Sequence, residues 1–186
     1  RVESLNHFAP MTRGSMARPP RSMAGTSFAA GYANADPGER PWNRVALFNG
    51  HGRNKRAMTV DLTKSEGQEV LHDLVRRSDG LIENNLPSSV EQVGMTWEEL
   101  SKVNPQLVMV RQPAFGLEGP YKNYRTFGGH MECILGHPLL RAHPDTDISL
   151  EYAPGGVPSD AAGGVGSAYA FLLGLLQRKR TGKGVY

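Results

Sequence analysis

One carboxylate in the 186-residue sequence stands where covalent chemistry would be favourable. Asp160 is followed by Ala161-Ala162-Gly163-Gly164 and then by a long apolar stretch, so we expect it to stand just before a helix. The N–H groups and positive dipole end of that helix would stabilise a carboxylate. The two glycines would let a ligand approach the backbone closely. Because aspartate is also a common N-cap residue, these residues alone leave a capping role and a catalytic role open.

Other reactive side chains are less suggestive. His130 and Glu132 share one expected helix, and His137 and His143 lie nearby, but their spacing lacks the His-x-x-x-His pattern of a zinc site. We therefore expect no metal. The single cysteine, Cys133, is interpreted as a small core residue, which excludes an internal disulfide and indicates a reducing, cytoplasmic setting. Neither a dinucleotide-binding glycine motif nor a P-loop occurs, so dehydrogenase and kinase functions gain no support.

Short apolar runs alternate with helical patterns through the middle of the chain. Strands are expected at 57–60, 81–83 and 107–110, with a capped helix beginning at Thr63 and another at Thr96. Strand, helix, strand, helix, strand at this spacing predicts an α/β fold with a parallel sheet and crossover helices. Later elements are expected to be a helix over 127–136, a loop over 141–158, and the long helix that ends near Arg180.

Composition limits the remaining classes. With 39% hydrophobic residues and a net charge of +3, the chain can bury a core and is not disordered throughout. Its longest nearly uncharged apolar run, residues 161–176, is shorter than the ~18 residues of a membrane span. No secretory leader is visible, so we expect neither membrane insertion nor export.

The first part of the chain is basic and irregular. Residues 1–56 hold nine Lys or Arg against three acids, and residues 1–44 are rich in proline and glycine without hydrophobic periodicity. The arginines have no interleaved aromatics or helical spacing, so nucleic acid is not the expected partner. We divide the chain into this irregular segment, 1–44, and a folded part, 45–186.

Five motifs together resemble family III CoA-transferases, the relatives of formyl-CoA and carnitine CoA-transferases. Each is weak alone, but their order and spacing are specific, and the match covers roughly residues 43–184. The motifs are residues 54–62, residues 83–87 followed by Val93-Gly94, residues 104–108, residues 115–120, and residues 156–160 continuing to 178–184.

The resemblance implies a Rossmann-like parallel sheet from a family of interlocked homodimers. It also implies that this chain is a central fragment, incomplete at both ends. In the family, the aspartate that matches Asp160 attacks an acyl-CoA thioester and passes through a mixed anhydride to an aspartyl-CoA thioester, which a carboxylic acid acceptor then resolves. Acyl-CoA and a small carboxylic acid are thus the implied substrates.

The same resemblance suggests residues that bind CoA. Val60 and Thr63 match positions near the adenine, Asn84 and Asn85 match positions along the pantetheine and phosphates, and Arg125 falls where a basic residue approaches the cofactor. The sequence departs from the family pattern in two places: Asn85 replaces a usual aromatic, and Gln92 replaces a usual arginine that would pair with phosphate.

Two alternatives stay open. The α-methylacyl-CoA racemases share the superfamily and use a matching aspartate with a histidine, which falls at Phe127 in this sequence, one helical turn before His130. The chain could also be a non-catalytic CoA-binding fragment.

Overall fold

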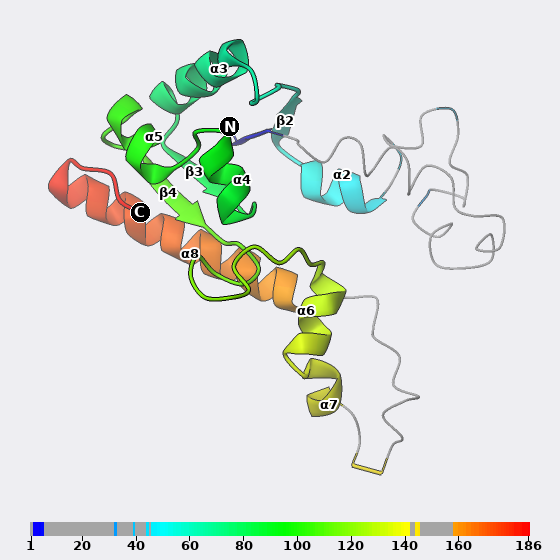
Figure 1. Cartoon of the computed structure of the whole chain (residues 1–186). Coiled ribbons are helices and arrows are strands. Elements are labelled where there is room, and N and C mark those ends of the chain that lie inside the picture. Colours follow the sequence, from blue (N-terminus) through cyan, green and yellow to red (C-terminus); the bar gives the residue numbers. More distant parts are fainter. Residues whose placement is uncertain are drawn as a thin grey trace. The chain divides into compact units, whose positions relative to one another are not determined.

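The computed structural model describes residues 2–5, 32, 39, 44, 46–141, 144–145 and 158–186. The chain divides into two compact units, Arg1–Asp61 and Leu62–Tyr186 (Figure 1). Nearly all of the expected irregular segment, and most of the expected loop over 141–158, lie outside the described residues. The second unit holds most of the elements that concern the candidate site.

The described residues of the first unit form two parallel strands and one short helix. Strand β1 (Val2–Leu5) pairs with β2 (Lys55–Met58), with Val2 opposite Lys55. Helix α2 (Ala46–Gly52) precedes β2, and Asn54 between them has a φ of 57°, a left-handed conformation that asparagine tolerates. The strand expected at 57–60 thus begins two residues earlier, and α2 was not predicted.

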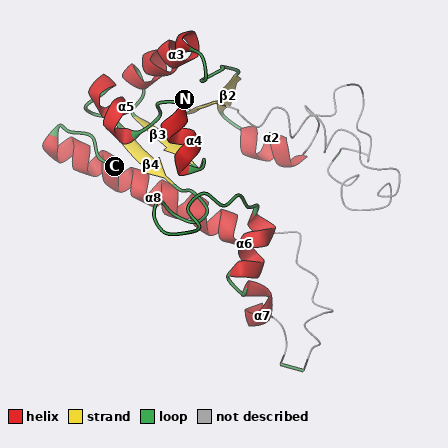
Figure 2. Ribbon diagram, viewed as in Figure 1, coloured by secondary structure: helices red, strands yellow, loops and turns green. Residues whose placement is uncertain are grey.

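The second unit is built on two parallel strands, β3 (Gly80–Glu83) and β4 (Val108–Arg111), which pair from Gly80 opposite Val108 to Glu83 opposite Arg111. Both strands lie within one residue of their predicted positions. Helices precede and connect them (Figure 2): α3 (Ser65–Arg76), α4 (Pro87–Gln92) and α5 (Trp97–Val103).

The three expected strands do not form one sheet in the described part of the chain. β2 pairs with β1 in the first unit, whereas β3 pairs with β4 in the second. All four residues of β2 are exposed, in contrast to the buried Val108 and Met109 of β4. Alternation of strands and helices indicates the parallel class correctly, but it carries no information on which strands are neighbours.

The core of the second unit lies between its helices and β4. Leu71 and Val75 of α3 are buried, as are Val90 of α4 and Leu100 of α5. Leu71 and Val75 are four residues apart, which is the helical spacing that predicted α3. The predicted threonine caps do not form: the N-cap of α3 is Lys64, and Thr96 makes no capping hydrogen bond through its side chain.

In the described ranges after β4, the chain forms three helices. The helix expected over 127–136 is shorter, because α6 (Gly128–Ile134) ends before Gly136, whose φ of 72° separates it from α7 (His137–Arg141). Helix α8 (Pro158–Thr181) packs against β4. Gly174 makes that contact possible, since a Cβ there would lie 2.4 Å from Val108 Cγ1.

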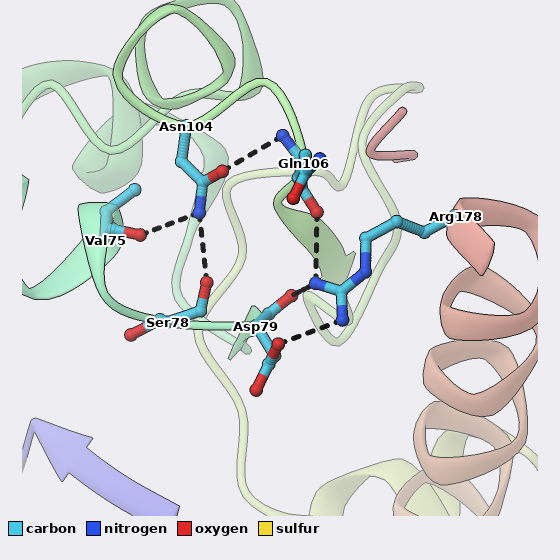
Figure 3. A network of polar contacts seen from close by, with 6 residues as sticks. All are labelled: Val75, Ser78, Asp79, Asn104, Gln106 and Arg178. Atoms are coloured by element: carbon cyan, nitrogen blue, oxygen red, sulfur yellow. Dashed lines mark hydrogen bonds and ion pairs between the residues drawn. The ribbon is translucent and has the colours of Figure 1, made fainter. Parts of the chain in front are cut away.

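A polar network joins the helices at the amino end of the sheet (Figure 3). Asn104 Nδ2 donates to the carbonyls of Val75 (2.9 Å) and Ser78 (3.0 Å). Arg178 of α8 donates to the Asp79 carbonyl at 3.0 Å and forms an ion pair with the Asp79 carboxylate at 2.9 Å. The amino ends of both strands are therefore fixed by contacts within the chain.

Of the helices in the described ranges, not one combines the length and the apolar composition that a membrane span needs.

Candidate functional site

Polar residues gather where β3 and β4 end. Asn84 and Asn85 follow β3, and Gln112 follows β4. Because the strands are parallel, their carboxyl ends lie at one edge, and the Gln112 N–H donates to the Glu83 carbonyl at 2.9 Å. This carboxyl edge is the usual place for a ligand in an open parallel sheet.

A buried ion pair fixes the carboxyl edge. The Glu83 carboxylate accepts a hydrogen bond from Arg111 Nε on the neighbouring strand, and both side chains are buried. Burial acts to lower the pKa of Arg111, but the hydrogen bond and charge of Glu83 outweigh it and raise that pKa. The other Glu83 oxygen accepts the Asn85 N–H at 2.6 Å. The backbone that carries the two asparagines is thus held by the strand ends.

The first turns of α8 reach the same edge. Ser167 Oγ donates to Gln112 Oε1 at 2.5 Å. Gly163 lies directly against Gln112, because a Cβ at this glycine would come within 2.2 Å of Gln112 Nε2. Asp160 stands one turn earlier on the same helix. Helix α8, which carries the candidate nucleophile, therefore contacts the carboxyl edge at Gln112, and the two asparagines follow β3 at that edge.

Asp160 lies inside the helix rather than before it. Helix α8 begins two residues earlier, at Pro158, so Asp160 is in the first turn and its side chain is exposed. The positive end of the helix dipole lies at this first turn. The prediction that Asp160 is the N-cap residue is wrong, because Pro158 adopts the fixed backbone geometry that suits a first helical position.

A different carboxylate satisfies the start of α8. Glu132 of α6 accepts the Ser159 N–H at 2.7 Å, and its other oxygen contacts His137 Nδ1 at 2.7 Å. The Ser159 N–H is the main cause that lowers the pKa of Glu132 to about 2, against the opposing effect of burial. Only 3% of Glu132 is exposed. Its contact with Ser159 spans 27 residues, so no local pattern could have revealed it.

The predicted CoA-binding residues differ in exposure and lie on several segments of the chain. Asn84 is exposed and Asn85 is half-buried. Arg125 is exposed on the segment between β4 and α6, and Thr63 is exposed before α3. Val60 is half-buried and belongs to the first unit.

The structure also gives the positions of Gln92, Cys133 and His130. Gln92, where an arginine is usual, ends α4 and is exposed. Cys133 was expected in the core but is exposed. His130 Nδ1 accepts the Phe127 N–H at 3.3 Å, so this histidine helps to cap α6. Among the described residues, no group of three or more His, Cys, Asp or Glu side chains is arranged to hold a metal ion; His143 lies outside those residues.

Sequence reasoning missed Gln112, Glu83 and Arg111. A polar residue directly after a buried strand was the available signal for Gln112, because carboxyl ends of parallel strands carry ligand contacts. Glu83 and Arg111 gave no such signal, because their pairing depends on the register of two strands that are 28 residues apart.

Comparison with known proteins identifies a family. A sequence model described as CoA-transferase family III matches residues 33–186. Succinyl-CoA–D-citramalate CoA-transferase of Chloroflexus aurantiacus is 36% identical over 135 residues, which cover 71% of this chain and 32% of the relative. Formyl-CoA:oxalate CoA-transferase of Streptomyces coelicolor is 32% identical over 131 residues, covering 70% of this chain and 31% of the relative.

A solved structure supports the same relationship. The crystal structure of a CAIB/BAIF family protein from Brucella suis superimposes with a TM-score of 0.69 at 31% identity, covering 76% of this chain and 37% of that protein. The chain spans about a third of the length of the curated relatives it matches.

Proposed function

Because the chain belongs to CoA-transferase family III, we propose that the native protein moves CoA from an acyl-CoA to a carboxylic acid through an aspartyl-CoA thioester at Asp160. The observation that carries this proposal is the position of Asp160: an exposed carboxylate in the first turn of α8, beside the carboxyl edge of β3 and β4. A nucleophile must be reachable by its substrate, and this one is.

The first half of the reaction transfers CoA to the protein. An Asp160 oxygen attacks the thioester carbonyl carbon, the C–S bond breaks, and the CoA thiolate leaves with the bonding electrons. The product is an acyl-aspartyl anhydride. The thiolate then attacks the aspartyl carbonyl carbon, and the donor acid leaves as its carboxylate. Asp160 now carries CoA as a thioester.

The second half reverses these steps with a new acid. The acceptor carboxylate attacks the aspartyl thioester and releases the thiolate, which then attacks the acceptor carbonyl of the new anhydride. This step restores the Asp160 carboxylate. One anion enters and one leaves, so the cycle needs no net proton transfer. The positive end of α8 favours the oxyanions that develop beside Asp160.

We assign the CoA contacts to the residues that match the binding positions of the family. Val60 and Thr63 are proposed to lie near the adenine, Asn84 and Asn85 along the pantetheine and phosphates, and Arg125 beside an anionic part of the cofactor. The exposure of Asn84 and Arg125 supports their availability to a ligand. Gln92 supplies no positive charge, so phosphate binding depends more on Arg125.

The racemase alternative is disfavoured by His130. Its Nδ1 accepts the Phe127 N–H, which places the proton of the neutral ring on Nε2. In that arrangement neither nitrogen offers a lone pair for removing an α-proton. Aspartate with an available histidine base is what a racemase requires.

The 186 residues span about a third of the length of their relatives, so we expect this chain alone not to turn over acyl-CoA. We assign residues 45–186 to the large domain, with a Rossmann-like sheet, and 1–44 to a separate irregular segment.

A homodimer is supported by five exposed apolar side chains on α8: Val165, Tyr169, Leu172, Leu173 and Leu176. We place the enzyme in the cytoplasm, given its single cysteine and acyl-CoA substrate.

Isotope and trapping experiments on the native enzyme test this function. Incubation with an acyl-CoA in deuterated water should leave the carbon beside the thioester unlabelled, while hydroxylamine should intercept an activated acyl or aspartyl group. Deuterium incorporation at that carbon without a trapped product would instead establish racemase chemistry.

A further inference from the structure

We propose that Glu132 is a positioning residue for Asp160: by holding the first turn of α8 from helix α6, it leaves the Asp160 carboxylate directed to substrate instead of to the helix N–H groups. This inference rests on the proposed nucleophilic role of Asp160.

The contacts of Glu132 are made to the residue next to the nucleophile. Glu132 Oε1 accepts the Ser159 N–H at 2.7 Å, and Ser159 directly precedes Asp160. Glu132 Oε2 contacts His137 Nδ1, also at 2.7 Å, so each carboxylate oxygen has a partner. With 3% of Glu132 exposed, water competes little for either oxygen.

Helix α8 needs such an acceptor from elsewhere in the chain. Its first residue, Pro158, has no N–H, and the residue before it in sequence, Val157, has no side-chain acceptor. A helix start without a cap leaves N–H groups unsatisfied. An aspartate in the first turn is well placed to turn back and accept them.

If the Asp160 side chain folded back in this way, the proposed reaction would be suppressed. A carboxylate that accepts backbone N–H groups is stabilised in its ground state, and both its charge and its lone pairs are then less available for attack on a thioester. Glu132 removes this competition because it already satisfies Ser159. The exposure of Asp160 agrees with this division of roles between two carboxylates.

Glu132 variants test the inference in the native enzyme. Glu132→Gln keeps an acceptor of the same length toward Ser159, whereas Glu132→Asp keeps the charge but withdraws the acceptor, and Glu132→Ala removes it. We expect the single-turnover rate of CoA-adduct formation to fall about 30-fold in Glu132→Ala and to stay within about fivefold in Glu132→Gln, with Glu132→Asp between them. KM for acyl-CoA should change less than about threefold.

The matched control is Asn104→Ala, which removes three hydrogen bonds at the opposite edge of the sheet and should leave the adduct rate unchanged. An unaltered rate in Glu132→Ala, or a faster reaction in Glu132→Asp than in Glu132→Gln, would overturn the positioning role while leaving the adduct in the wild type. If Glu132→Ala does not fold, the order of the Asp and Gln variants still decides. Absence of any adduct in the wild type would instead overturn the proposed function and, with it, this inference.

Discussion

The two edges of the β3–β4 sheet use similar polar residues for different purposes. At the amino edge, Arg178 forms an ion pair with Asp79, and the Asn104 amide donates to backbone carbonyls (Figure 3). At the carboxyl edge, the buried Glu83 and Glu132 hold the backbone, while the side chains of Asn84 and Asp160 remain exposed.

This contrast indicates which end of the sheet is available for function. A polar group whose partners lie within the chain contributes to stability, and removing it exposes the unsatisfied partner. A polar group that stays exposed beside such fixed backbone is available to a ligand. Changes at the amino edge should therefore affect unfolding, and changes at the carboxyl edge should affect catalysis.

The largest effect is expected at Asp160. Asp160→Asn keeps the size of the side chain but removes the proposed nucleophilic carboxylate, so CoA transfer by the native enzyme should fall at least about a thousandfold. Affinity for CoA, measured by calorimetry, should stay within about threefold because the proposed contacts lie elsewhere. Asp73→Asn on the exposed surface of α3 is the control and should keep full activity.

At the amino edge, Asn104→Ala should separate stability from activity. Its amide joins Val75, at the end of α3, to Ser78 in the turn that precedes β3, so we expect a loss of about 1–3 kcal/mol in the free energy of unfolding. Urea titration measures this change. Gln106→Ala is the control, because only the backbone of Gln106 takes part in the network. A stable Asn104→Ala protein with reduced kcat would break the distinction between the edges.

Adjacent glycines of α8 allow a finer comparison. Alanine generally stabilises a helix relative to glycine by about 0.5–1 kcal/mol, and Gly164→Ala should show that gain because no neighbouring atom lies within 4 Å of its added Cβ. Gly163→Ala must displace Gln112, so it should be less stable than Gly164→Ala by about 1 kcal/mol. Equal stabilities would show that Gln112 does not hold α8 at the carboxyl edge.

Acid should weaken the hold of Glu132 on α8. Because the folded-state pKa of Glu132 is lowered from 4.5 to about 2, its contribution to stability is complete above pH 4.5 and is lost as the pH falls toward 2. Acid unfolding followed by circular dichroism should therefore be less steep in Glu132→Gln than in the wild type over this window. Identical acid profiles would show that Glu132 is not bonded in its charged form.

The smallest effect is expected at His130. His130→Gln removes a ring that caps α6 but no proposed catalytic group, so CoA transfer should stay within about tenfold, a barrier change below about 1.4 kcal/mol. A loss of three orders of magnitude, about 4 kcal/mol, in a folded variant would favour acid–base chemistry over transfer.

Local patterns predicted much of the second unit. β3, β4 and α5 lie within one residue of expectation because their apolar residues and their breakers, such as Asn104-Pro105, are local signals. The five ordered motifs also gave the family, which the match over residues 33–186 confirms. Helix α4 was missed, since its six residues are too few to show a helical period.

Contacts between distant residues were beyond such patterns. A glutamate in a short helix normally faces water, so nothing in the sequence near Glu132 indicated that its side chain would be buried and would accept the Ser159 N–H. The start of α8 was placed three residues late, at Ala161 instead of Pro158, for a related reason: the acceptor that replaces its N-cap comes from α6 and not from the adjacent sequence.

Mass spectrometry of the peptide that contains Asp160 tests the central claim most directly. After the native enzyme is incubated with an acyl-CoA and digested, this peptide should carry the mass of CoA less one water, and hydroxylamine should convert the adduct to an aspartyl hydroxamate at residue 160. The adduct should be absent from Asp160→Asn. An unmodified Asp160 in an enzyme that is turning over, or an adduct on another carboxylate, would contradict the account.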